Sequence, residues 1–215
     1  CESIAVELHR RYNVRYQTIR NVPLLKGNIK PEEKEKYILY QGAVNEARGF
    51  ESLMPAMKNI ELPLVICGDG NFMPQLKHLI AENNLGDKVI LKGMLPPEEL
   101  AELSQKAVIG INLVENTGMN QYLSLANKFF DYIHAGLPQI TMNFPEYKKI
   151  NDKYNIALLL DDLKPETISE AINKLASDKE LYNELYNNCS IAKTELNWQK
   201  EKDVLLSFYQ KLFAP

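Results

Sequence analysis

The chain has 215 residues, of which 25 are lysine or arginine and 28 are aspartate or glutamate, so its formal net charge is −3. Apolar residues make up 45% and charged residues 25%, values that exclude a disordered segment, collagen and a coiled coil. The negative charge supplies no basic field for nucleic-acid backbones, and no apolar run approaches the roughly 18 residues that a spanning helix needs.

Cysteine and histidine are too few and too scattered to predict a metal site. The three cysteines form neither an even disulfide framework nor a paired ligand spacing, and the three histidines share no ligand spacing. Cys67 ends an apolar run, where a buried reduced thiol is expected. Because the N-terminus also shows no signal-peptide pattern, the expected location is the cytoplasm.

The first 36 residues are expected to form a hinge or linker. Residues 3–12 predict a helix, and residues 18–23 look extended up to Pro23. Residues 24–36 mix lysines and glutamates without apolar periodicity, which is typical of a solvated connector.

From residue 37 to residue 160, short apolar runs of strand length alternate with segments of helical period. Strands are expected at residues 37–40, 64–67, 89–91, 108–113, 139–142 and 156–160, and helices at residues 50–60, 72–84, 97–106, 125–135 and 145–154. Runs that are apolar throughout predict strands buried on both faces, and the alternation predicts right-handed crossovers. The expected fold is a doubly wound, mostly parallel, six-stranded α/β sheet.

After residue 160 the sequence is helical to its end. Helices are expected from residue 163, over residues 179–196 and over residues 197–212, so that a domain covers residues 37–196 and one further helix follows over residues 197–215. That last helix carries an apolar stripe, which includes Trp198 and Phe208 and must bury against another surface. Three surfaces remain open: this sheet, a further domain, or a second copy of the chain in a dimer.

Basic side chains follow two of the predicted strands, at the edge where a doubly wound sheet binds its ligands. Arg48 precedes one helix, and Lys128 lies in the first turn of another. Helix N-termini add exposed N–H groups and positive dipole ends. Two cations from separate connections suit a diphosphate better than a single carboxylate. Taken singly, each could equally face solvent, and Asp131 could pair with Lys128 across one helical turn.

Gly68-Asp69-Gly70 follows a predicted strand and resembles half of a dinucleotide-binding fingerprint. The third glycine is absent, because Met73 stands in its place. We therefore expect a tight turn, in which the glycines either let the backbone approach a ligand or allow close packing.

The residues from about 18 onward resemble glycosyltransferase family 4. Residues 127–132, Asn-Lys-Phe-Phe-Asp-Tyr, and residues 135–138, Ala-Gly-Leu-Pro, are similar to the P-N-K-L-F-E-Y and A-G-L-P motifs of a bacterial polysaccharide branch. Residues 42–50 resemble the family's first loop, and residues 64–70 and 89–95 resemble its next two strands. The resemblance implies the C-terminal, Rossmann-like half of a two-domain GT-B enzyme. An acceptor-binding domain would precede Cys1, and the last helix would cross to it.

The same resemblance implies a nucleotide-sugar donor, UDP- or GDP-linked, with no metal or other cofactor. It also gives roles to individual residues. The diphosphate would meet Arg48, Lys128 and the amides of Ala126 and Asn127, the ribose would meet Asp131, and the base would lie against Gly93, Met94 and Leu95.

The sequence departs from the family at several positions. Leu123 replaces the first acid of the family's E-x7-E pair, and Asp131 shortens the second. Ala43 stands where the first loop usually has arginine, and Ala126 stands where the branch has proline. The loss of the first acid leaves the donor-sugar contacts open.

Three residues of the loop before residue 125 could replace the lost acid, although each could also be an ordinary surface residue. They are Glu115, Asn120 and Tyr122. No catalytic residue is assigned.

The implied function is donor binding in a retaining glycosyltransferase of hexosyltransferase type that builds a bacterial surface polysaccharide. The absent domain would supply a glycan or lipid-linked acceptor, without which the chain would be inactive, and the full-length enzyme could lie at the inner membrane. Two alternatives remain. A hydrolase or epimerase would need a histidine in the crevice, for which His134 is poorly placed, and a non-catalytic scaffold or nucleotide-binding domain is favoured by Leu123.

Overall fold

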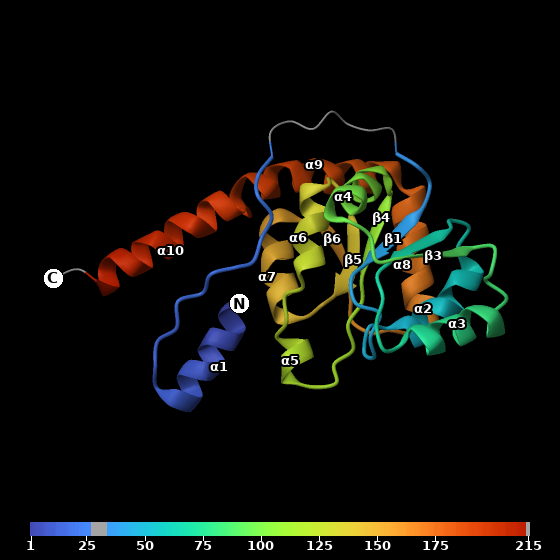
Figure 1. Ribbon diagram of the computed structural model, residues 1–215. Helices are drawn as coiled ribbons and strands as arrows, with labels where there is room; N and C mark the ends of the chain where they lie inside the picture. The colour runs from blue at the N-terminus through green and yellow to red at the C-terminus, as the bar shows by residue number, and fades with distance from the viewer. Residues whose placement is uncertain (27–33, 214–215) are drawn as a thin grey trace.

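A single parallel sheet lies at the centre of the computed structural model, which describes residues 1–26 and 34–213 (Figure 1). Within the described residues the sheet has six strands in the order β3-β2-β1-β4-β5-β6. The strands are β1 (Ile38–Gln41), β2 (Leu64–Cys67), β3 (Val89–Gly93), β4 (Ile109–Asn112), β5 (Gln139–Met142) and β6 (Ala157–Leu160). The predicted doubly wound α/β fold is therefore confirmed.

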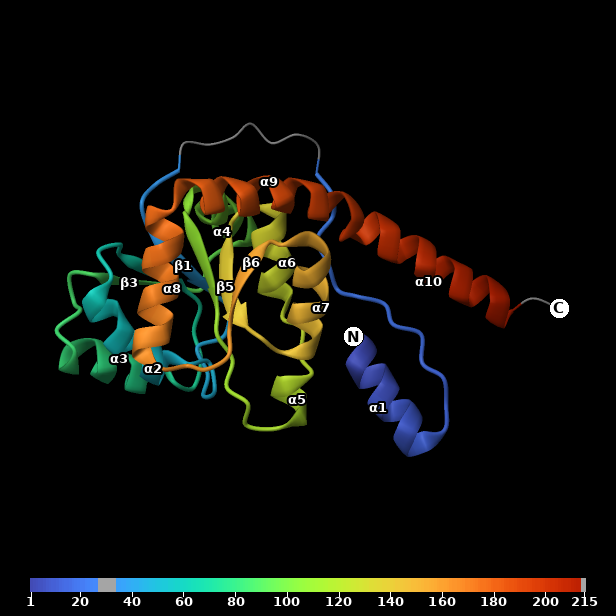
Figure 2. The ribbon, with the colours of Figure 1, turned by 180° about the vertical axis from the view of Figure 1, so that it is seen from behind.

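Helices cover both faces of the sheet. They are α1 (Glu2–Tyr12), α2 (Phe50–Ala56), the 3-10 helix η1 (Met57–Asn59), α3 (Met73–Glu82), α4 (Pro97–Lys106), α5 (Met119–Tyr122), α6 (Asn127–His134), α7 (Pro145–Tyr154), α8 (Pro165–Ser177), α9 (Lys179–Glu195) and α10 (Trp198–Leu212). Helices α4, α6 and α7 lie on one face and α2, α3 and α8 on the other, as Figures 1 and 2 show from opposite sides. Helix α9 packs against α6, α7 and α8.

The two faces of β1 explain this layering. Ile38 and Tyr40 belong to the large apolar core that includes residues of α2, α3 and α8. Leu39 belongs to a smaller core on the other face, with Tyr132 of α6 and residues of α4. All four residues of β1 are buried, as a central strand of a doubly wound sheet requires.

Strand β3 corrects one expectation. The run at residues 89–91 predicted a strand buried on both faces, but Ile90 is 44% exposed and burial alternates along β3. The reason is topological, because β3 is an edge strand and a helix layer covers only part of it. The helix expected at residues 50–60 also divides, with α2 ending at Ala56 and η1 continuing to Asn59.

The segment before the sheet is more than a solvated connector where it is described. The Trp198 amide donates to the Pro23 carbonyl at 2.9 Å, and Gln199 exchanges two hydrogen bonds with the backbone of Leu25. The backbone N–H and guanidinium of Arg20 both donate to the buried Glu201. This part of the chain is therefore joined to the start of α10; residues 27–33 of the predicted linker lie outside the described residues.

Beyond this joint, α10 extends away from the sheet (Figure 1). Glu201 is its one buried residue among those described, and its exposed apolar side chains are Val204, Leu206, Phe208, Tyr209 and Leu212. Trp198, at the start of the predicted stripe, packs against the large apolar core, whereas Phe208 and the later part of the stripe do not bury against this sheet. No helix in the described part of the chain has both the length and the apolar character needed to cross a membrane.

Candidate functional site

The sheet opens between β1 and β4, where the strand order reverses. These strands pair only at Ile38–Ile109 and Leu39–Gly110, so their carboxyl ends separate. The Tyr132 hydroxyl fills the gap, since it accepts from the Gln41 amide at 3.1 Å and lies 3.2 Å from the Leu39 carbonyl oxygen. A crevice at such a reversal is where this class of fold binds ligands.

Lys128, from the first turn of α6, lies across the end of β1. Its Nζ is 3.6 Å from the centroid of the buried Tyr40 ring, and a Cβ at Gly42 would lie 3.4 Å from the same Nζ. Gly42 has φ of 117°, which favours glycine, so the residue after β1 allows the ammonium to approach the backbone closely. This is a cation–π contact at the floor of the crevice.

Arg48 lies close enough to act on the same lysine. Burial lowers the pKa of Lys128 well below its usual range, and the positive charge of Arg48 lowers it further, while Asp131 acts in the opposite direction. The charge of Arg48 also acts on Tyr40. The charges of the two predicted diphosphate ligands therefore act on each other, and no hydrogen bond or ion pair joins Arg48 to another described residue. Two cations that repel each other, with Asp131 as the one described acidic group acting on Lys128, favour an anionic ligand.

The start of α6 contributes fewer exposed amides than the sequence suggested. The Ala126 N–H donates to the Tyr147 hydroxyl at 3.1 Å, so this predicted ligand already has an acceptor. Asn127 is exposed at the first helical position, and no side chain caps the helix. The Phe129 amide donates to the Ala126 carbonyl at 3.1 Å, so in the first turn the N–H groups of Asn127 and Lys128 remain available to an anion.

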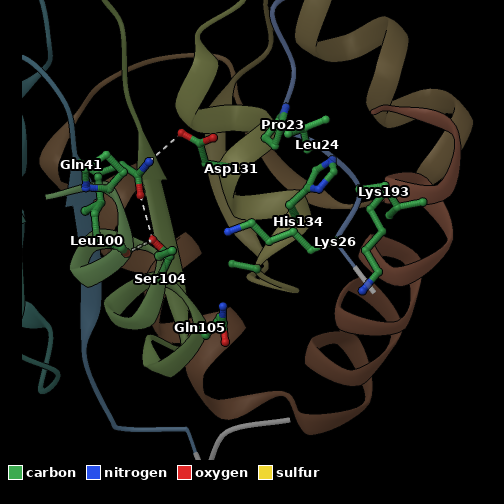
Figure 3. Close-up of a pocket in the computed structure, with 14 residues that line it drawn as sticks. Pro23, Leu24, Lys26, Gln41, Leu100, Ser104, Gln105, Asp131, His134 and Lys193 are labelled. Atoms are coloured by element: carbon green, nitrogen blue, oxygen red, sulfur yellow. Dashed lines mark hydrogen bonds between the residues drawn. The ribbon is translucent and has the colours of Figure 1, made fainter. Parts of the chain in front are cut away.

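Asp131 lies one turn further along α6 and points toward β1. Its Oδ2 accepts from Gln41 Nε2 at 2.8 Å, and Ser104 Oγ of α4 donates to Gln41 Oε1 at 2.9 Å (Figure 3). Burial raises the pKa of Asp131 from 3.8 to about 6, although the Gln41 hydrogen bond and the Lys128 charge act in the opposite direction. The alternative that Asp131 merely pairs with Lys128 is not realised among the described ion pairs, because each side chain has a different neighbour.

A cavity of about 330 Å³ lies beside Asp131, between α4 and α6. Figure 3 shows Gln41, Ser104 and Asp131 on one side of it and Lys26, His134 and Lys193 on the other. The Nε2 atom of His134 lies 2.8 Å from the Leu196 carbonyl oxygen, which can only accept, so this nitrogen carries the proton and is held there. This hydrogen bond gives His134 a structural role, as expected for a residue that takes no part in catalysis.

The three residues predicted for the base lie at the end of β3 and share no contact with this cavity. Met94 is 76% exposed, and a Cβ at Gly93 would meet nothing within 4 Å. Leu95 packs with the apolar residues of α4 instead. Gln41 and Ser104, which the sequence analysis did not select, are nearer to Asp131. The sequence did contain a signal for Gln41, because this polar residue directly follows the apolar run of residues 37–40. The structure shows that its side chain is buried.

Two of the three donor-sugar candidates line a second cavity, at the carboxyl ends of β4, β5 and β6. Glu115 and Tyr122 belong to it, whereas Asn120 does not. The Glu115 amide donates to the Ala47 carbonyl at 3.1 Å, which places Glu115 next to the Arg48 turn. Burial raises the pKa of the Glu115 carboxyl, and the charge of Glu51 raises it further.

The glycine turn after β2 has a packing role. A Cβ at Gly68 would lie 1.8 Å from the Gly42 carbonyl oxygen, and one at Gly70 would lie 2.3 Å from the Val44 carbonyl oxygen. The Asp69 carbonyl accepts from the Val44 amide at 3.0 Å. Close packing against the β1 loop, the second of the two roles expected, therefore accounts for both glycines. In the described residues, no group of three or more His, Cys, Asp or Glu side chains could hold a metal.

Comparison with known proteins agrees with the fold. The family described as "Glycosyl transferases group 1" matches residues 23–190. No protein among the curated sequences matches the chain.

Solved structures share its fold at low sequence identity. A mutant of TarM from S. aureus, in complex with Fondaparinux, alpha-GlcNAc-glycerol and UDP, aligns with a TM-score of 0.75 and 16% identity over 100% of this chain and 43% of its own. Sucrose-phosphate synthase from Thermosynechococcus elongatus aligns with a TM-score of 0.71 and 21% identity over 98% of this chain and 57% of its own.

A third structure corresponds to one domain only. The C-terminal domain of a glycosyl transferase group 1 family protein (LpcC) from Francisella tularensis aligns with a TM-score of 0.59 and 14% identity, over 75% of this chain and 86% of its own. The chain thus spans about half the length of the longer structures and most of an isolated C-terminal domain.

Proposed function

This chain belongs to the glycosyl transferases group 1 family, and from that premise we propose that it is the donor-binding half of a retaining glycosyltransferase. Its ligand would be a nucleoside diphosphate sugar, with uridine or guanosine as the nucleoside. The bound UDP of the TarM complex supports a nucleotide donor for this fold.

One observation carries the proposal: Lys128 lies over the Tyr40 ring at the end of β1, and the positive charge of Arg48 acts on it. A diphosphate would offset both positive charges, and the free amides at the start of α6 would add hydrogen bonds. Asp131, held by Gln41, would then accept hydrogen bonds from the ribose hydroxyls.

The proposed chemistry is substitution at the anomeric carbon with retention of configuration. Negative charge develops on the departing diphosphate, and fixed cations stabilise that charge most effectively when they are already in place. Lys128 is held by the Tyr40 ring and the Gly42 backbone, so little reorganisation is needed when the donor binds. We assign no residue of this chain as a general acid or base.

The rest of the enzyme is part of the proposal. An acceptor-binding domain would precede residue 1, residues 1–36 would act as the hinge, and α10 would reach across to that domain. The acceptor would be a glycan or a lipid-linked glycan of a bacterial surface polysaccharide, at the cytoplasmic face of the membrane. Without that domain, the exposed apolar residues of α10 would favour a dimer of this chain.

Isothermal titration calorimetry with UDP and GDP tests the site. A charge-assisted contact to phosphate contributes about 1.5–3 kcal/mol, so Arg48→Ala and Lys128→Ala should each weaken nucleotide binding about tenfold or more. The melting temperature should hardly change in Arg48→Ala, because Arg48 has no hydrogen-bond or ion-pair partner among the described residues, so this variant separates lost binding from lost stability. Lys77→Ala, on the exposed surface of α3, is the matched control.

Equal affinity of both variants and the parent would show that the site is wrongly assigned. No binding of either nucleotide by the folded parent would favour the alternative of a scaffold domain, for which Leu123 in place of the family's acid is the best evidence.

A further inference from the structure

The second cavity, at the carboxyl ends of β4, β5 and β6, has a volume of about 320 Å³. Besides Glu115 and Tyr122, its walls include Asn143, Phe144, Asp161 and Asp162. The first three of these follow β5 or β6 directly, in connections that the sequence analysis did not assign to any ligand. A cavity of this size accommodates a hexose.

Its position along the sheet edge is specific. Glu115 joins the turn that carries Arg48, because its amide donates to the Ala47 carbonyl and its carboxylate accepts from the Gly49 amide. Asp131 and Lys128 lie at the end of β1, whereas the second cavity lies at the ends of β4, β5 and β6, further along the same edge. The Arg48 turn connects these two parts of the edge. A nucleoside diphosphate sugar with its diphosphate at the two cations would extend its sugar toward the second cavity.

The walls of the second cavity suit a polyol. The Tyr122 and Phe144 rings lie 5.2 Å apart between centroids and provide an aromatic surface for C–H groups. Asn143 Nδ2 donates to Asp161 Oδ1 at 2.7 Å. The carboxylate of Asp161 has further lone pairs, which suit a ligand that carries hydroxyl or amine hydrogens.

The charge of the cavity is one-sided. Three carboxylates line it, and none of its lining residues is lysine, arginine or histidine. The nearest cation along the chain, Lys164, is paired with Asp162 at 3.2 Å. Sugar hydroxyls or an ammonium can donate to carboxylates, but a carboxylate on the sugar would meet like charges only.

From these walls we infer that the second cavity seats the sugar of the donor and selects sugars without a carboxylate over uronic acids. This inference rests on the proposed donor site, because it takes the diphosphate at Arg48 and Lys128 as its starting point. It supplies sugar contacts for a chain in which Leu123 replaces the acid expected there.

Calorimetry with matched donors tests the selection on the 215-residue chain. UDP-glucose and UDP-glucuronate differ only in the oxidation of C6, as GDP-mannose and GDP-mannuronate do if guanosine is the preferred nucleoside. We expect the uncharged donor to bind at least about tenfold more tightly than the uronate, because the uronate carboxylate would lie among carboxylates of like charge. Asp161→Asn should narrow that ratio, whereas Asp152→Asn, at an exposed carboxylate of α7 that does not line the cavity, should leave it unchanged.

Tyr122→Ala gives a second measurement that is independent of charge. It should abolish the gain in affinity of the uncharged donor over the bare nucleoside diphosphate. Equal binding of uronate and uncharged donor, or a donor ratio unaffected by Asp161→Asn and Tyr122→Ala, would overturn the inference while nucleotide binding itself persists. Loss of all nucleotide binding in the parent would instead remove the proposed function and this inference with it.

Discussion

The connections that follow β1 and β2 leave the sheet at the same edge, yet their polar groups differ in whether they have partners. After β2, the Gly68 amide donates to the Gly93 carbonyl at 2.7 Å, and the Gly70 amide donates to Asp69 Oδ1 at 2.8 Å. After β1, Arg48 has no such partner among the described residues. The Lys128 ammonium lies over the Tyr40 ring, and burial lowers the pKa of Lys128. The β2 connection satisfies its polar groups within the fold, whereas the β1 connection presents a cation that no hydrogen bond or ion pair with a described residue fixes.

This difference separates two glycine-containing turns that look alike in sequence. Glycine permits close backbone approach whether the approaching group is a ligand or another loop. The two roles can be distinguished by asking whether the polar groups of each turn have hydrogen-bond partners within the fold. A buried polar group without a partner destabilises the folded state unless a ligand binds it. Substitutions in the β2 connection should therefore mainly lower the stability of the fold, and substitutions in the β1 connection should mainly weaken ligand binding.

The largest effect is expected at Gly68. Gly68→Ala would place a Cβ 1.8 Å from the Gly42 carbonyl oxygen at a φ of 149°, which a side chain rarely adopts. We expect a loss of about 3 to 5 kcal/mol in the free energy of unfolding, measured with urea. Gly86→Ala, where a Cβ meets nothing within 4 Å, should change it by less than about 1 kcal/mol. Similar urea midpoints for the two variants would contradict the packing role of the β2 turn.

Asp131 should make stability depend on pH. Its pKa is raised in the folded chain from 3.8 to about 6, so protonation favours folding. The stabilisation is fully present below about pH 4 and is lost as the pH rises through about 6, with a total of about 3 kcal/mol at most. Asp131→Asn should therefore unfold at a higher urea concentration than the parent at pH 7 and at the same concentration at pH 4.

Asp87→Asn, at an exposed carboxylate, is the control for that measurement and should not alter the pH dependence. A difference in stability between the parent and Asp131→Asn that is the same at pH 4 and pH 7 would show that Asp131 is not held in a water-poor environment.

The smallest effect on stability is expected in α10. Phe208 and Leu212 are 40% and 59% exposed, so the double variant Phe208→Ser and Leu212→Ser should change the free energy of unfolding by less than about 0.5 kcal/mol. Sedimentation velocity should find the parent partly dimeric and the variant monomeric. A loss of stability in the variant would mean that α10 packs on its own sheet after all.

Much of the fold follows from local sequence. The strands at residues 64–67 and 139–142 and the helices at residues 97–106 and 145–154 have the predicted bounds, because each is bounded by proline, glycine or a polar residue. Helix α5 was not predicted, since four residues in a polar loop show no period. The exposure of Ile90 depends on β3 being at the sheet edge, which no local pattern reveals.

Some features of the candidate site could also be predicted from the sequence, and others could not. The position of Arg48 and Lys128 near the same edge of the sheet was predictable, because the carboxyl ends of parallel strands share one edge. The capture of the Ala126 amide by Tyr147 and the chain of hydrogen bonds from Ser104 to Asp131 join distant segments, so spacing alone could not reveal them. The same holds for the cavity at Asn143 and Asp161, which three separate strands build.

The most direct test of the central claim is the titration of the Lys128 ammonium. NMR of the labelled lysine ε-carbons can follow it, with the signal assigned by its absence in Lys128→Met. Without nucleotide, the midpoint should lie well below 10.5, and saturating UDP or GDP should raise it because the diphosphate offsets burial and the charge of Arg48. A midpoint near the ordinary value for lysine that no nucleoside diphosphate moves would contradict an anion site at these two cations.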